Sequence, residues 1–139
     1  MKRLPLLLTG ICLLLAGGVS ACGGPADAPA AKTVVSNGGT YSVSFETTPA
    51  AIPMNEPFTV VFRVSPKSGG APGEPKVEID ARMPAHGHGM NRVPKVTRLA
   101  DGTVKAEGLL FHMPGHWELY VDITQGGVTE RAQFDVHLK

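Results

Sequence analysis

The chain has 139 residues, with 13 basic and 12 acidic residues and a formal net charge of +1. This length suits one small domain, and a balanced charge without a basic stripe argues against nucleic-acid binding. Both cysteines, Cys12 and Cys22, lie near the N-terminus, so the rest of the chain cannot hold the disulfide framework of many secreted domains.

Residues 1–21 have the pattern of an export signal. Lys2 and Arg3 precede an apolar run over residues 4–16, which is too short for a membrane span and has the length of a signal-peptide core. The sequence VSAC, ending at Cys22, resembles the lipobox of bacterial lipoproteins, in which the chain is cut before the cysteine and the sulfur carries a diacylglycerol. An ordinary signal peptide followed by a stray cysteine is the alternative.

The lipobox resemblance implies a lipid-anchored, extracytoplasmic protein of the cell envelope. Gly23 stands where an inner-membrane retention signal would have aspartate, which favours the periplasmic face of the outer membrane in a Gram-negative cell. Removal of Lys2 and Arg3 with the signal peptide changes the net charge from +1 to −1. Residues 22–39 hold the lipidated cysteine and a Gly-, Ala- and Pro-rich stretch that predicts a flexible tether, which leaves residues 40–139 as the folded domain.

Apolar and polar residues alternate along several segments of this domain, as in residues 117–123. A period of two marks half-buried strands, and no long helical period is found. Asp101-Gly102 and Gly126-Gly127 indicate hairpin turns. The pattern predicts an all-β, immunoglobulin-like sandwich of seven antiparallel strands, at residues 40–47, 57–65, 75–83, 94–99, 103–111, 116–125 and 128–138.

Histidines and methionines concentrate in two short stretches. MPAHGHGMN (83–91) follows the third predicted strand, and FHMPGHWEL (111–119) leads into the sixth. These two strands are antiparallel neighbours in an immunoglobulin-like sandwich, so the stretches meet at one rim. The second strand, preceded by Met54, begins at the same rim. Four of the five histidines and every methionine after Met1 therefore converge there.

The residue types at this rim favour copper, in its monovalent state. Imidazole binds several transition metals, whereas soft thioether sulfur selects monovalent copper, and no thiolate or carboxylate cluster is present to favour zinc. His86, His88 and Met90 would point the same way on an extended backbone, and Gly87 and Gly89 would let the loop wrap closely. The candidate ligands are His86, His88, Met90, His112, Met113, His116 and Met83.

Some of these residues also have a structural explanation. Met83 continues the apolar face of the third strand, and Met113 follows Phe111 at a strand corner, so core packing accounts for both as well as ligation does. Met54 is the weakest candidate ligand. His137 alternates outward on the last strand, as a solvated side chain would.

The two stretches also resemble a known family. MPAHGHG and FHMPGHWELYVDI are similar to the motifs of the YtkA-like domain, an extracytoplasmic, immunoglobulin-like β-sandwich with an M-P-x-H-G-H type loop and a later F-x-M-x-G-x-W segment. The resemblance spans residues 40–138 and implies a link to copper handling. His112, His116 and Met90 go beyond the family motif and rest on spacing alone. The motif itself covers Met83, His86, His88, Phe111, Met113, Gly115 and Trp117.

Together these features predict a lipid-anchored, extracytoplasmic copper-binding protein. It would buffer the metal or deliver it to a membrane cuproenzyme or another copper-handling protein. The alternative is a metal-free interaction module whose rim binds a protein partner at the cell envelope. No Ser/His/Asp set and no carboxylate pair stands out near the rim, so the sequence does not predict an enzyme.

Overall fold

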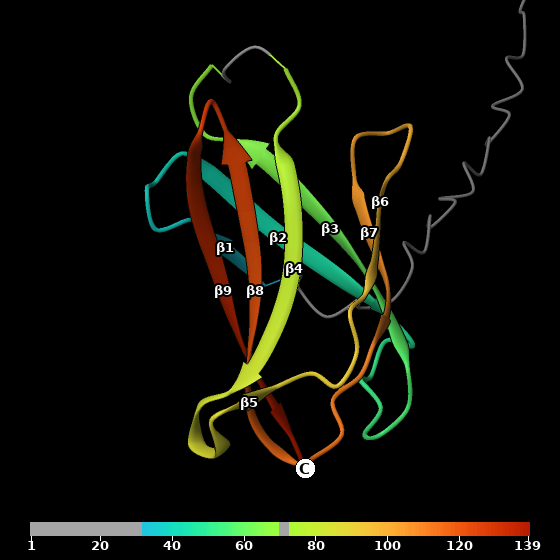
Figure 1. The fold of residues 1–139 in the computed structure, drawn as a ribbon. Helices are drawn as coiled ribbons and strands as arrows, with labels where there is room; N and C mark the ends of the chain where they lie inside the picture. Colours follow the sequence, from blue (N-terminus) through green and yellow to red (C-terminus); the bar gives the residue numbers. More distant parts are fainter. Residues whose placement is uncertain (1–31, 70–72) are drawn as a thin grey trace, which may run out of the picture.

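The computed structural model describes residues 32–69 and 73–139, which form two antiparallel β-sheets (Figure 1). One sheet has the strand order β1-β2-β3-β7-β6, and the other has the order β5-β4-β8-β9. Within these ranges, no helix is long and apolar enough to cross a membrane. The elements are β1 (Thr33–Val35), β2 (Tyr41–Thr48), β3 (Phe58–Pro66), β4 (Lys76–Met83), the 3-10 turn η1 (Pro84–His86), β5 (His88–Gly89), β6 (Lys95–Arg98), β7 (Val104–Leu109), β8 (Gly115–Gln125) and β9 (Val128–Leu138).

The prediction of an all-β chain is confirmed, and each predicted strand matches an observed one to within a residue or two at its ends. The predicted number of strands is too low, because the described residues contain nine. The additional strand β1 lies inside the segment predicted as tether, where Val34 pairs with Val43 of β2. The folded part therefore begins before residue 40. The predicted signal peptide and Cys22 lie outside the described residues.

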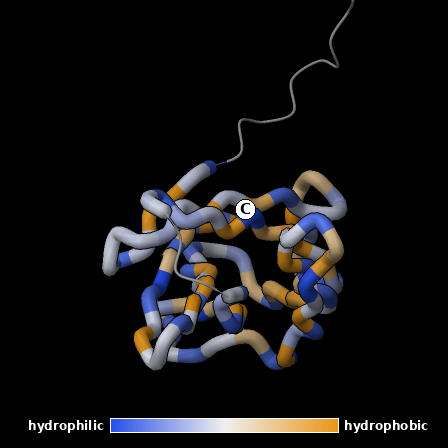
Figure 2. Tube along the Cα trace, turned by 90° about the horizontal axis from the view of Figure 1, so that it is seen from above, coloured by the Kyte–Doolittle hydropathy of each residue, from blue (hydrophilic) through white to orange (hydrophobic). Residues whose placement is uncertain are grey.

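The core lies between the two sheets, because alternate residues of each strand point inward. In β4, for example, Val77, Ile79 and Ala81 are buried while the residues between them are more exposed. Figure 2 views the molecule from above, where hydrophobic and hydrophilic residues alternate along the trace. Phe45 of one sheet meets Phe134 of the other edge-to-face, with ring centroids 4.8 Å apart. Contacts of this kind join the two sheets into one core.

The register of β4 against β8 determines which loops meet. Ala81 pairs with Leu119 and Arg82 with Glu118, so the end of β4 lies beside the start of β8, as predicted. The segments 49–57, 84–94 and 110–114 all lie at this end of the sandwich (Figure 1), which we call the rim end. The hairpin turns at residues 99–103 and 126–127 lie at the opposite end.

Candidate metal centre

The loop after β4 does not continue as an extended chain. Pro84 begins the 3-10 turn η1, and Gly87 adopts a φ of +67°, a left-handed conformation that favours glycine. The chain then folds back so that His88 pairs with Met83 at the end of β4. The prediction that His86, His88 and Met90 share one face of an extended strand is therefore wrong. The turn brings the two histidines together instead.

Three histidines lie in a row at the rim end. The ring centroids of His86 and His88 are 5.7 Å apart, and those of His88 and His112 are 5.0 Å apart. His86 is exposed on the loop, whereas His88 and His112 are half-buried. His112 comes from the segment between β7 and β8, so two separate parts of the chain contribute. We call His86, His88 and His112 the histidine row.

Trp117 forms the floor beneath this row. Its side chain is fully buried, stacks on Phe111 with centroids 4.6 Å apart, and donates its indole N–H to the Met113 carbonyl at 2.9 Å. The rings of His112 and His88 meet the indole edge-on, at 5.4 Å and 6.1 Å respectively. Because the indole is held on one side by stacking and at its N–H by a hydrogen bond, it gives the two imidazoles a rigid, apolar support.

Nδ1 of His112 is buried and has no hydrogen-bond partner among the described residues. His88 differs, since its Nδ1 lies 3.2 Å from the Gly89 carbonyl oxygen. A buried polar atom without a partner costs about 1–3 kcal/mol, and in a native protein it requires an explanation such as a bound ion. A bound metal ion or an ordered water would supply the partner that this nitrogen lacks.

The methionines surround the row at different depths. Met83 is 1% exposed and belongs to the core, and its terminal methyl lies 3.1 Å from where a Cβ on Gly115 would stand. Met90 and Met113 are half-buried and pack against the core cluster. Met54, on the 49–57 segment, is 49% exposed. The structure thus places every predicted methionine at the rim end and gives Met83 a core position.

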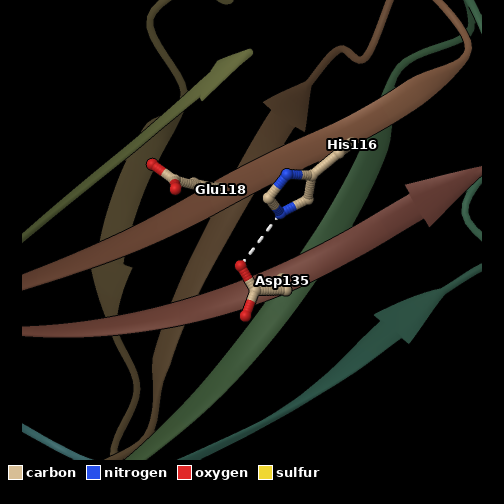
Figure 3. A group of neighbouring side chains, drawn as sticks. All are labelled: His116, Glu118 and Asp135. Carbon is tan, nitrogen blue, oxygen red and sulfur yellow. Dashed lines mark hydrogen bonds and ion pairs between the residues drawn. The ribbon is translucent and has the colours of Figure 1, made fainter. Parts of the chain in front are cut away.

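His116 lies apart from the histidine row, on the outer face of the sheet β5-β4-β8-β9. Because side chains alternate along β8, Trp117 points into the core and His116 points outward. Its Nε2 lies 2.9 Å from an oxygen of Asp135 (Figure 3). Its ring also stacks on that of His137, with centroids 4.7 Å apart. The geometry does not support the prediction that His116 is a ligand of the same site as His86 and His88.

Asp135 and Glu118 are additional ligand-type residues that the sequence analysis missed. The hydrogen bond from His116 holds the pKa of Asp135 below its ordinary value, so the carboxyl group stays deprotonated. Glu118 accepts a hydrogen bond from the Tyr120 hydroxyl, which raises the pKa of that tyrosine. The sequence could have predicted this grouping, because the period of two along β8 and β9 places residues 116, 118, 135 and 137 on one outward face.

Comparison with protein-family models, with curated proteins and with solved structures gives no match for this chain. The resemblance to the YtkA-like domain therefore rests on the two short sequence motifs alone.

Proposed function

We propose that this protein is a lipid-anchored, extracytoplasmic copper-binding protein that holds monovalent copper at the histidine row. The observation that carries the proposal is the buried, unpartnered Nδ1 of His112, whose ring neighbours that of His88, which in turn neighbours that of His86. A neutral imidazole offers a nitrogen lone pair to a metal, and ligation would offset the cost of burying that atom.

The spacing of the rings supports a shared ion. A metal at a ring nitrogen lies about 3 Å from the ring centre, because metal–nitrogen bonds are about 2.0–2.1 Å long. Two imidazoles that bind one ion therefore have centroids no more than about 6 Å apart. The centroid distances of 5.7 Å (His86–His88) and 5.0 Å (His88–His112) satisfy this limit for each neighbouring pair. An ion shared by all three imidazoles would require these side chains to move closer together, since their ligand atoms do not all lie within 4.8 Å of one another.

The donor types support monovalent copper. The two cysteines of the chain are Cys12 and Cys22, so no thiolate can come from the described residues. Met90 and Met113 lie half-buried at the rim end, and thioether sulfur is the soft donor that monovalent copper prefers. Neutral nitrogen and sulfur ligands suit a singly charged soft cation, whereas zinc sites use thiolates, imidazoles and carboxylates.

The proposal also includes the fold family, an immunoglobulin-like sandwich of the YtkA-like type. The order β2-β3-β7-β6 in one sheet and β4-β8-β9 in the other corresponds to the ABED and CFG sheets of a constant-type immunoglobulin sandwich. This order supports an immunoglobulin-like, YtkA-like domain. Buffering of copper, or its delivery to a membrane cuproenzyme, follows from an ion held at an exposed loop beside a membrane anchor.

A metal-free interaction module is the second candidate function. It is favoured by the large apolar side chains exposed on the rim-end segments, with Val93 at 95% and Met54 at 49% exposure. Apolar side chains that form a contiguous exposed patch are typical of partner-binding surfaces, whereas single ones are common on any protein. This alternative requires no metal and gives the histidine row no role in binding one.

Competition with a chromophoric monovalent-copper chelator tests the proposal on the full-chain protein. We expect one copper per chain in the parent and a loss of affinity of more than about tenfold, or about 1.4 kcal/mol, in a His86→Ala/His88→Ala variant. The fold should survive because His86 is exposed and the half-buried His88 is not part of the buried core. His137→Ala is the matched control and should bind copper like the parent. Equal copper retention by the parent and the double variant would remove the histidine row from the site.

A further inference from the structure

Four ligand-type side chains form a block on the outer face of β8 and β9. In the antiparallel register His116 lies opposite His137, and Glu118 lies opposite Asp135. One ligand atom each from His116, Glu118 and Asp135 lie within 4.8 Å of one another (Figure 3). The His137 ring stacks on that of His116 with an interplanar angle of 17°. The block is separate from the histidine row, because Trp117 points to the opposite side of the same strand.

We infer that this block, His116, Glu118, Asp135 and His137, is a second metal site that takes a borderline divalent cation such as zinc. Its donors are two imidazoles and two carboxylates without sulfur, a set that suits zinc and disfavours monovalent copper. Two ionised carboxylates complement the charge of a divalent ion. This inference goes beyond the proposed copper function and does not depend on it.

The present geometry needs a side-chain adjustment of about 1 Å to bind an ion. Tetrahedral zinc, with bonds of about 2.0–2.2 Å, puts its ligand atoms about 3.3–3.6 Å apart, whereas those of His116, Glu118 and Asp135 lie within 4.8 Å of one another. The side chains of His116 and Asp135 are 38% and 49% exposed and are free to make that movement. An ion between them would replace their hydrogen bond of 2.9 Å.

The surroundings favour a defined site. All four residues lie on the two longest strands of the described chain, paired along their whole length, and ligands on rigid elements are held more accurately than ligands on loops. The Tyr120 hydroxyl donates to Glu118 and would orient that carboxylate as an outer-shell partner. Arg131, on the same face, is held by two hydrogen bonds of 2.7 Å to Asp122, so this guanidinium is paired away from the block.

Calorimetric titration of the full-chain protein with zinc alone tests the inference. We expect the parent to bind zinc, and a His116→Ala/His137→Ala variant to lose more than about tenfold in affinity, or about 1.4 kcal/mol. Asp135→Asn, which keeps the shape and removes the charge, should lose affinity as well and guards against a folding defect in the double variant. His86→Ala/His88→Ala is the matched control on the other surface and should retain this zinc binding.

Three results would overturn the inference: no zinc binding by the parent, unchanged binding by both outer-face variants, or a loss confined to the His86/His88 variant. The third result would move zinc to the histidine row. Copper competition on the same proteins separates the two proposals, because His116→Ala/His137→Ala should keep monovalent copper. A negative result for copper at the histidine row would therefore not affect the zinc test, and a negative result for zinc would not affect the copper test.

Discussion

The buried nitrogen of His112 is expected to lower the stability of the metal-free protein and to contribute to metal binding. Without a metal, Nδ1 is desolvated and has no hydrogen-bond partner among the described residues. With a metal, the same atom becomes a ligand in an apolar setting made by Trp117. An interaction module would have no reason to keep such an atom, so the residue distinguishes the two candidate functions.

Replacing His112 with phenylalanine should therefore have opposite effects on stability and on copper. The metal-free protein should gain about 1 kcal/mol, because the unsatisfied polar group is removed while an aromatic ring remains against Trp117. Monovalent-copper affinity should fall by more than about tenfold. Denaturant unfolding of the metal-free protein and chelator competition measure the two effects. A metal-free variant less stable than the parent would contradict the absence of a partner for Nδ1.

Met83 allows core packing and ligation to be separated. The side chain is 1% exposed and packs against Gly115. Met83→Ala should cost about 2–5 kcal/mol, whereas Met83→Leu, which conserves volume, should cost less than about 1.5 kcal/mol. Because the burial indicates a core role, Met83→Leu should keep the copper affinity of the parent. A well-folded leucine variant with weakened copper binding would instead identify the Met83 sulfur as a ligand.

At the scale of elements, the long strands were predictable because one face of each is buried, which imposes a period of two on the sequence. The short strands were not. β1 has three residues in a Gly-, Ala- and Pro-rich stretch and is defined by its pairing with β2, and β5 has two residues defined by pairing with β4. The convergence of histidines was predictable from strand adjacency. The outward position of His116 also follows from the sequence, because neighbouring residues of a strand face opposite sides and Trp117 begins the apolar face.

Glu130 connects β9 to the turn between β1 and β2. Its carboxylate accepts hydrogen bonds from the Ser36 hydroxyl at 2.6 Å, from the Thr40 backbone N–H at 3.1 Å and from the Thr40 hydroxyl. These hydrogen bonds, the one from Ser36 foremost, lower the pKa of Glu130 from its ordinary value of 4.5. The turn that carries β1 is thus tied to the opposite sheet through one ionised side chain.

This arrangement predicts a pH-dependent contribution of Glu130 to stability. Because its pKa is lower in the folded state, the contribution is fully present above the ordinary value of 4.5 and is lost as pH falls through the lowered folded value. Glu130→Gln should therefore be less stable than the parent at pH 7, and the difference should shrink in acid. Denaturant unfolding of both proteins from neutral pH to about pH 3 measures it. A difference that is constant over this range would show that the charge of Glu130 has no role.

At the scale of the whole molecule, two donor sets of different softness lie near one end of the sandwich, on opposite sides of the same strand. The histidine row offers imidazoles and nearby thioethers, whereas the outer face offers imidazoles and carboxylates. Donor softness selects between metals more reliably than affinity alone. A single small domain could in this way keep a monovalent soft ion and a divalent ion apart.

The proposed anchor determines where such a domain would work. If Cys22 carries a lipid and β1 begins at Thr33, the intervening residues reach at most roughly 40 Å from the membrane surface, since an extended chain spans about 3.3–3.6 Å per residue. The observed β1 makes this tether shorter than the predicted one. The short reach would keep the start of the folded domain close to the membrane surface, as the proposed delivery to a membrane cuproenzyme requires.

Replacing Cys22 with alanine tests the anchor, because a lipobox without its cysteine can be neither lipidated nor cut at that position. The variant should leave the membrane fraction or retain its signal peptide, which fractionation and electrophoretic mobility together report. Cys12→Ala is the matched control, since Cys12 lies in the segment that would be removed, and it should be anchored and processed like the parent. Released Cys22→Ala protein should still bind monovalent copper, because the histidine row lies wholly within the folded domain. If Cys22→Ala fractionates and migrates like the parent, the protein is not a lipoprotein, and delivery of copper from a membrane-tethered position would lose its basis.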